Sequence, residues 1–126
     1  MTAQPFDDIA ALLGVYFDGL YHSDSALLAR AFHPQARYVT ATGDELLHLD
    51  MPDYFRVVDN RPSPASRNEP RQDVIREIQI AGPTTAFARV NCSIGDRYFT
   101  DFLSLIKTDG EWRIISKVFH YDLTDN

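Results

Sequence analysis

The chain has few of the features typical of small secreted proteins and of membrane proteins, namely paired cysteines and long apolar runs. It contains one cysteine, Cys92, so it cannot form an intrachain disulfide. No apolar run approaches the roughly 20 residues that a membrane-spanning helix needs. The N-terminus lacks the positive region and the long apolar run of a signal peptide. We therefore expect a cytoplasmic protein with no membrane partner.

Positive charge is also scarce, and this argues against a nucleic-acid partner. The net charge is -6, and the ten arginines are scattered through the chain with only two lysines beside them. The four histidines show no His-x-His or His-x-x-x-His spacing, so we predict no metal. Neither a phosphate-binding loop nor a G-x-S-x-G motif around a serine occurs. We expect no cofactor.

The chain has the length and composition of one folded domain. Its 126 residues are 44% apolar and 12% aromatic, which predicts a single domain over 1–126 with one core. Apolar residues recur at helical spacing over 9–21, and helical patterns follow in 22–34 and 49–60. Ser23 or Asp24 is the expected N-cap of the second helix.

The second half of the chain has the alternation typical of strands. Four alternating segments occupy 71–82, 84–94, 97–107 and 111–122, and tight-turn dipeptides such as Asp109-Gly110 join them. Two further brief strands are expected within 36–49, around Thr42-Gly43-Asp44. The segment 61–70, with three prolines, predicts a loop or a mobile flap. The fold class is therefore α+β: three N-terminal helices packed on a curved antiparallel sheet.

Two stretches, "YFDGLYHSDSALLARAFHPQARYV" at 16–39 and "DFLSLIKTDGEWRIISKVFH" at 101–120, carry a family resemblance. Together they resemble the nuclear-transport-factor-2-like (NTF2-like) superfamily of SnoaL-like, cystatin-like cone proteins, and within it the lumazine-binding group. The resemblance implies a conical sheet, a pocket at its open end and a homodimer through the outer sheet face. This fold hosts isomerases, dehydratases, cyclases, epoxide hydrolases and binding modules, so the resemblance leaves the activity open.

Asp101 is the strongest candidate for a catalytic group. In "RYFTDFLSL" it alternates onto the same side as Phe99, Leu103 and Leu105. A carboxyl group in such surroundings loses hydration and becomes suited to general acid or base catalysis. The alternative is a structural acid that is satisfied by an arginine, tyrosine or histidine of a neighbouring strand or of a partner chain. If the last two strands pair about Asp109-Gly110, Asp101 lies roughly opposite Lys117 or Phe119, so an ion pair is also possible.

The resemblance implies a catalytic role for Asp101 together with Tyr16, but one catalytic residue of the related enzymes is absent here. Ketosteroid-isomerase-like members keep an acid on a comparable strand, and Tyr16 falls near the place of their helix-1 tyrosine, a hydrogen-bond donor. Where those enzymes place an aspartate base, this chain reads 38–40, Tyr-Val-Thr, with no carboxylate. The resemblance therefore does not support isomerisation by that mechanism.

Other candidates would line a pocket. His120 ends the last strand and is a candidate proton shuttle at the pocket mouth, with a hydrogen-bonded strand-end histidine as the alternative. Aromatic side chains suit a flat ligand, although a small core also needs them. The predicted ligand-binding residues are Tyr16, Tyr54, Tyr38, Phe99 and Phe119.

Three functions are compatible with these residues. The first is a domain that binds a small apolar or aromatic molecule, with its biological function unassigned. The second is a metal-free acid–base enzyme of the polyketide cyclase, dehydratase or isomerase type, which would use Asp101, His120 and Tyr16. The third is a non-catalytic dimeric interaction module, for which Phe87 on the outer strand face is suggestive.

Overall fold

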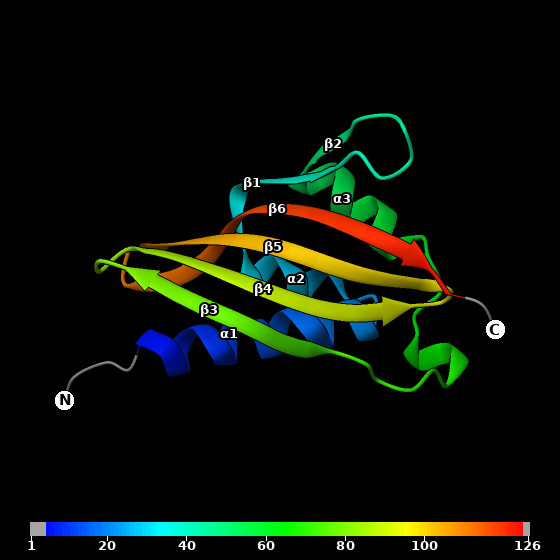
Figure 1. Ribbon diagram of the computed structural model, residues 1–126, viewed down its shortest axis with the longest axis horizontal. Coiled ribbons are helices and arrows are strands. Elements are labelled where there is room, and N and C mark those ends of the chain that lie inside the picture. Colours follow the sequence, from blue (N-terminus) through cyan, green and yellow to red (C-terminus); the bar gives the residue numbers. More distant parts are fainter. Residues whose placement is uncertain (1–4, 125–126) are drawn as a thin grey trace.

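A computed structural model describes residues 5–124 of the chain. It contains three α-helices, six strands and one short 3₁₀ turn. In chain order these are α1 (Pro5–Tyr21), α2 (Ser25–Ala31), β1 (Phe32–Thr40), β2 (Leu47–Asp50), α3 (Met51–Asp59), η1 (Ala65–Arg67), β3 (Val74–Ala81), β4 (Thr85–Ile94), β5 (Arg97–Thr108) and β6 (Glu111–Leu123). Figure 1 shows the helices lying along one side of a curved sheet.

Local sequence signals account for where several of these elements begin and turn. The Asp24 carboxylate accepts hydrogen bonds of 3.0 and 3.2 Å from two backbone amides in the first turn of α2, which identifies it as the N-cap. Asp50 caps α3 in the same way, through the Asp53 amide at 2.9 Å. Asp109 and Gly110 both adopt positive φ, of 53° and 79°, as a tight turn between antiparallel strands requires.

The six strands form one open sheet in the order β2-β1-β6-β5-β4-β3. All neighbouring pairs are antiparallel except β1 and β6, which run parallel. The prediction of an α+β cone is confirmed, and the prediction of a wholly antiparallel sheet is corrected at that one pair. Residues that pair between β1 and β6, such as Val39 and Val118, are 79 positions apart in the sequence. No local turn signal can therefore predict this pairing.

The segment 61–70 is a loop, one of the two forms predicted for it. It contains η1 and is held at its end by Glu69. The Glu69 carbonyl accepts a 2.6 Å hydrogen bond from the Tyr21 hydroxyl, and its carboxylate accepts one of 2.9 Å from the Gly95 amide. These contacts tie the segment to α1 and to the β4–β5 turn, two parts of the chain that are remote in sequence.

A β-bulge in β6 changes which side chains face the helices. Ser104 pairs with Ser116 and Leu105 pairs with Ile114, so Ile115 has no partner on β5. Before the bulge Ile114 is buried, whereas after it the buried side chains are Lys117 and Phe119. The bulge therefore shifts the alternation of β6 by one residue.

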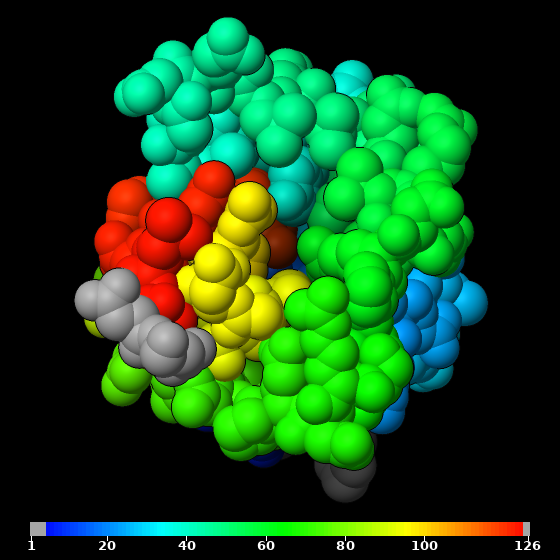
Figure 2. Space-filling model, turned by 90° about the vertical axis from the view of Figure 1, so that its right-hand side faces the viewer, coloured from blue at the N-terminus to red at the C-terminus, as the bar shows by residue number. Residues whose placement is uncertain are grey.

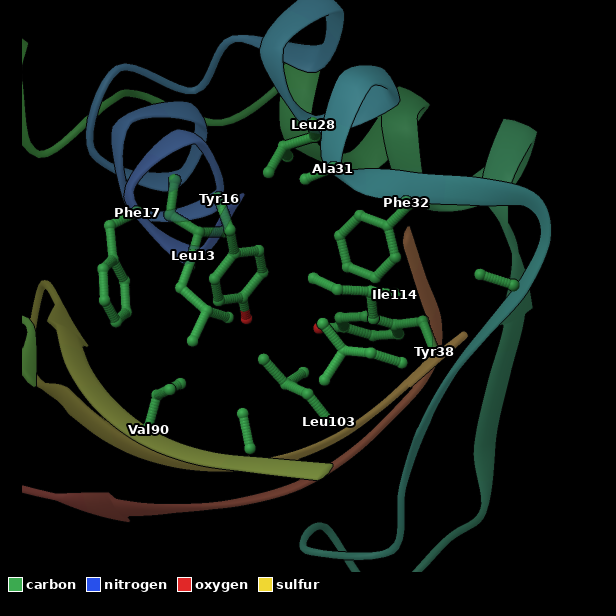
Figure 3. Close-up of a cluster of buried hydrophobic side chains, with 14 of the residues drawn as sticks. Leu13, Tyr16, Phe17, Leu28, Ala31, Phe32, Tyr38, Val90, Leu103 and Ile114 are labelled. Atoms are coloured by element: carbon green, nitrogen blue, oxygen red, sulfur yellow. The ribbon is translucent and has the colours of Figure 1, made fainter. Parts of the chain in front are cut away.

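The core lies between the concave side of the sheet and the helices. Figure 3 shows α1 and α2 presenting side chains to the strands, with Leu13 and Tyr16 pointing toward Leu103 and Val90. The buried face of α1 comprises Ile9, Leu13, Tyr16, Phe17, Gly19 and Leu20. No helix within residues 5–124 is long and apolar enough to cross a membrane.

Candidate functional site

Asp101 occupies the middle of the concave face and is completely buried. It is 0% exposed on β5, where it pairs with Phe119 across the β5–β6 ladder. The Tyr16 hydroxyl on α1 donates a 2.5 Å hydrogen bond to Asp101 Oδ2. Charge-assisted hydrogen bonds are short and strong, so α1 and the sheet are joined by a polar contact inside an apolar core.

Lys117 brings a positive charge to the same point. Its Nζ lies 3.8 Å from Asp101 Oδ2, and the residue is 4% exposed. Five aromatic rings surround the ammonium, with ring centroids 5.1 to 6.0 Å from Nζ. Rings at this distance attract a cation, and the attraction grows where water is excluded. The five rings, which we call the aromatic cage, belong to Tyr16, Tyr38, Tyr54, Phe99 and Phe119.

Burial sets the protonation of the phenols around this pair. Burial and then the negative Asp101 raise the pKa of Tyr16 well above its ordinary value. Burial likewise raises the pKa of Tyr54, although the positive Arg61 opposes the rise. Burial raises the pKa of Tyr38 as well, against the opposing charge of Lys117. All three hydroxyls therefore keep their protons at neutral pH and act as hydrogen-bond donors.

Several buried polar atoms near the cage have no hydrogen-bond partner within residues 5–124. They are Asp101 Oδ1, the Tyr54 hydroxyl, and Nε and Nη2 of Arg61. A buried polar group without a partner is costly, so such groups are rare in folded proteins. Tyr54 belongs to the aromatic cage, Asp101 lies beside it, and the charge of Arg61 acts on Tyr54, so these atoms are neighbours within the core.

A small cavity lies at the Arg61 end of the core. Its volume is about 10 Å³, room for one water molecule. Figure 2 looks onto this end, where a hollow opens between the β5, β6 and β1 segments and the segment after α3. The cavity is lined by Leu20, Tyr38, Arg61, Cys92, Ile94, Phe99 and Lys117.

The lone cysteine is one of the lining residues, and its chemistry is that of a buried thiol. Burial, followed by the negative charge of Asp101, raises the pKa of Cys92 to about 12. The thiolate is the nucleophilic form, so at neutral pH this side chain is unreactive. With 6% exposure, Cys92 packs as a small buried hydrophobe.

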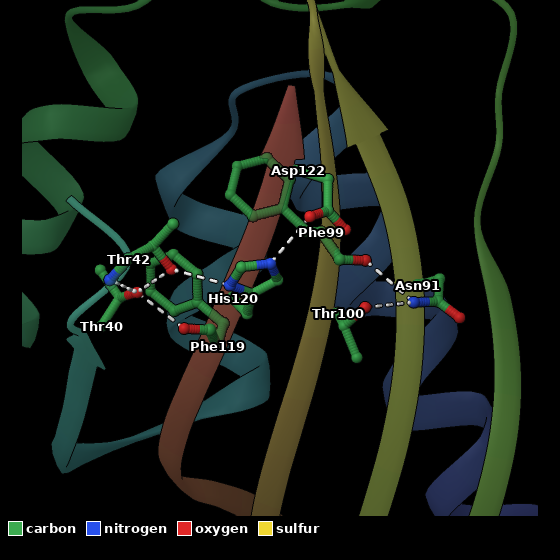
Figure 4. Close-up of polar contacts among 8 residues, drawn as sticks. All are labelled: Thr40, Thr42, Asn91, Phe99, Thr100, Phe119, His120 and Asp122. Carbon is green, nitrogen blue, oxygen red and sulfur yellow. Dashed lines mark hydrogen bonds and ion pairs between the residues drawn. The ribbon is translucent and has the colours of Figure 1, made fainter. Parts of the chain in front are cut away.

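His120 lies away from the cage, on the outer face of the sheet. Its side chain is 60% exposed and contacts the Asp122 carboxylate at 2.9 Å through Nε2 and the Thr42 hydroxyl at 3.4 Å through Nδ1 (Figure 4). This corrects the expectation that His120 lines the pocket mouth. The bulge at Ile115 is the reason, because it turns Lys117 and Phe119 inward and His120 outward.

The structure gathers the other predicted site residues and adds two that the sequence did not single out. Tyr16, Tyr38, Tyr54, Phe99, Phe119 and Asp101 all meet at one place. Lys117 was expected only as a possible partner of Asp101, and Arg61 was assigned to a loop. The one sequence signal for Lys117 is rarity, since the chain has only two lysines.

The described residues place no three His, Cys, Asp or Glu side chains where they could hold a metal ion. The chemistry available in the cage is instead that of one carboxylate, one ammonium, one guanidinium and several phenols. Such a set can bind a polar group of a small molecule, or move a proton on it, without a metal. Fold and site together define a cone-shaped α+β domain with a polar internal site.

Comparison with known proteins identifies the family. Residues 4–120 match the family described as "Putative lumazine-binding", so the chain belongs to that family within the NTF2-like superfamily. A protein named aldolase FrzH, from a Cladobotryum species, is 26% identical over 122 residues, which cover 95% of this chain and 94% of that protein.

Solved structures share the fold along the whole chain. An NTF2-like protein of unknown function from Shewanella baltica is 30% identical, with a TM-score of 0.87, and the match covers 98% of this chain and 100% of that one. A second such protein, from Methylobacillus flagellatus, is 30% identical with a TM-score of 0.82 over 97% and 95% of the two chains. A ketosteroid isomerase-like protein from Erwinia carotovora is 11% identical, with a TM-score of 0.73 over 95% and 98%, and shows the fold alone.

Proposed function

We propose that this protein binds a small, largely apolar or aromatic molecule at the Arg61 end of its core. The observation that carries the proposal is the group of buried polar atoms without partners, on Arg61, Tyr54 and Asp101, at the edge of the aromatic cage. A binding site of this kind has mostly apolar walls with a few placed polar groups. A ligand that supplies the missing hydrogen bonds would gain affinity from each of them.

Fragment binding followed by NMR tests this proposal, with two variants as matched controls. We expect neutral aromatic fragments to shift the backbone amides of Tyr38, Cys92 and Phe99. Ile94→Trp narrows the mouth and should abolish these shifts, because Ile94 lines the cavity. Val57→Trp, on the exposed side of α3, should leave them intact. Shifts elsewhere in the protein, or shifts that survive Ile94→Trp, would contradict the proposal.

Acid–base catalysis on a carbonyl compound is the second candidate. The name of the FrzH relative favours it, since aldol chemistry removes a proton beside a carbonyl group. In this proposal Asp101 takes the proton through Oδ1, which has no partner within residues 5–124. Tyr16 or Lys117 stabilises the negative oxygen that develops. His120 has no part in it, because it lies on the opposite face of the sheet.

Proton exchange in D₂O separates the second candidate from simple binding. We expect the protein to accelerate exchange of the α-protons of small ketones such as cyclohexanone, and Asp101→Asn to lose that acceleration while retaining affinity. Asn keeps the shape of the side chain and removes the base. Equal exchange rates for the two proteins, or none above the buffer rate, would leave ligand binding as the function.

We also propose that two copies associate through the outer face of the sheet. Phe102 and Val118 are 48% and 49% exposed there, and Phe87 packs edge-on against Phe102 with ring centroids 5.9 Å apart. An apolar patch of this kind suits the centre of an interface. Sedimentation analysis should give a dimer for the native chain and a monomer for Phe102→Asp. A native monomer would contradict this proposal.

A further inference from the structure

One edge of the Arg61 guanidinium has no partner. Its Nε and Nη2 atoms are buried and make no hydrogen bond within residues 5–124. These two nitrogens form the side of the guanidinium that holds a carboxylate through two parallel hydrogen bonds. By contrast, the same kind of edge on Arg76 is used, with Nε bonded to Asn91 and Nη2 to Tyr98. Arg61 thus presents a free bidentate donor.

A third donor lies beside it. The Tyr54 hydroxyl is buried next to the Arg61 guanidinium, whose charge and side-chain hydrogen bond both oppose the rise of the Tyr54 pKa. Because the phenol keeps its proton, it can accept from Arg61 and still donate a hydrogen bond to a ligand. Three neighbouring donors favour a ligand group that only accepts hydrogen bonds. An ionised carboxylate is such a group, and its two oxygens match the spacing of Nε and Nη2 of Arg61.

The charges around the cavity point the same way. Arg61 and Lys117 line it, and no acidic side chain does. The nearest acid, Asp101, already has its Oδ2 engaged by Tyr16 and Lys117. This positive site lies inside a chain whose net charge is -6. A low-dielectric wall strengthens the attraction between such a site and an anion.

The remaining walls define the rest of the ligand. They are apolar or aromatic, which suits a short hydrocarbon or ring attached to the carboxylate. They are formed by Leu20, Tyr38, Cys92, Ile94 and Phe99. Since the cavity has room for about one water molecule, the Arg61 side chain must swing outward to admit such a body. Nε and Nη2 of Arg61 have no hydrogen-bond partner within residues 5–124, so the contact that this movement loosens is the one with the Tyr54 hydroxyl.

We propose that the ligand is a small carboxylic acid with an apolar or aromatic body, bound through the Nε and Nη2 edge of Arg61 and the Tyr54 hydroxyl. This inference rests on the proposed ligand-binding function and specifies its ligand class.

The test compares two probes of nearly equal shape, benzoate and its neutral amide, benzamide. The Nε–H signal of Arg61 is followed by ¹H–¹⁵N NMR in the full chain. We expect benzoate to shift that signal and to bind at least about tenfold more tightly than benzamide, since hydrogen bonds between charged groups are strong. Arg61→Met should remove this preference, while Arg30→Met, on the exposed side of α2, should keep it.

A stability measurement keeps a folding defect from imitating the result. Arg61→Met removes two unpartnered buried donors, so its melting temperature should equal or exceed that of the native protein. A residue with a structural role would instead lower the melting temperature when replaced.

The remaining outcomes each decide the matter. Benzoate and benzamide binding equally in the cavity would overturn the carboxylate inference and leave ligand binding intact. A larger Arg61 shift with inorganic phosphate than with benzoate would also overturn it. If neither benzoate nor the neutral fragments of the binding screen perturb the cavity, both the inference and the proposed function fail.

Discussion

The two halves of the core are built on different physical principles. Near the β5–β6 hairpin, Leu13, Leu105 and Ile114 are at most 1% exposed and bring no charge or hydroxyl group to their contacts. From the middle of the concave face onward, Asp101 and Lys117 are the buried charged residues of the described chain, and phenols surround them. We call these the apolar half and the polar half.

We infer from this difference that the apolar half mainly stabilises the fold and that the polar half serves another role. Burial of aliphatic side chains stabilises the fold without directional demands. A buried ion pair loses its hydration, and apolar residues of similar volume are often at least as stabilising. The presence of a polar half is therefore better explained by binding or chemistry than by folding. The predictions below test that separation.

The largest effect is expected when the ion pair is broken on one side. Asp101→Leu leaves Lys117 as a buried cation with no carboxylate beside it, and Tyr16 without its acceptor. We expect the free energy of unfolding to fall by about 4 kcal/mol, measured by urea denaturation. A loss below about 1 kcal/mol would mean that Lys117 finds water or another partner.

The double variant Asp101→Leu with Lys117→Met is the control. It removes both charges, and its stability should return to within about 1 kcal/mol of the native value or exceed it. If the double variant instead has a lower free energy of unfolding than the single variant, the ion pair stabilises the fold. The polar half would then contribute to stability as the apolar half does.

A somewhat smaller effect is expected in the apolar half. Leu105→Ala leaves a cavity in the core and should reduce the free energy of unfolding by about 3 kcal/mol. Because Leu105 pairs with Ile114 and does not line the internal cavity, the affinity for probe ligands should not change. The measurements are urea denaturation and the NMR titration. Loss of ligand affinity would show that the two halves are coupled.

The last effect is absent at neutral pH and appears only in alkali. Tyr16, Tyr38 and Tyr54 have raised pKa values in the folded state, while an unfolded chain releases the same protons near pH 10. The folded state therefore retains protons that the unfolded state loses. The contribution of these three phenols to stability should not change with pH below about 9 and should fall above pH 10, by about 1.4 kcal/mol per pH unit for each retained proton.

Unfolding curves recorded at several alkaline pH values measure this slope. Tyr38→Phe removes one titrating group and should reduce it, whereas Leu105→Ala should leave it unchanged because neither Leu105 nor its partner Ile114 titrates. A slope that persists in Tyr38→Phe would mean that Tyr38 ionises equally in both states.

Much of the fold follows from signals a few residues long. The caps at Asp24 and Asp50, the Asp109-Gly110 turn and the alternation of 97–107 each act between near neighbours. Such signals depend on backbone geometry that is the same in any protein, so a single sequence reveals them. They placed Asp101 correctly on the side of Phe99 and Leu103.

The site needed information that no local pattern contains. In β6, an unbroken alternation from Ile114 would point Ser116, Val118 and His120 inward, and the bulge at Ile115 reverses this. Only pairing with β5 reveals the bulge. Arg61 reaches the cavity because contacts through Glu69 fix the path of its segment. Proline content alone predicted a loop or a mobile flap and gave no indication of this path.

By itself, the sequence determined the helices, the strands, the inward face of β5 and the buried acid at its centre. The tertiary structure alone decided that Lys117 and not His120 meets Asp101, and that Arg61 lines the cavity. The physical reason is the sequence distance over which each kind of interaction acts. Caps, turns and alternation are settled within a few residues, whereas strand register and loop placement depend on partners tens of residues away.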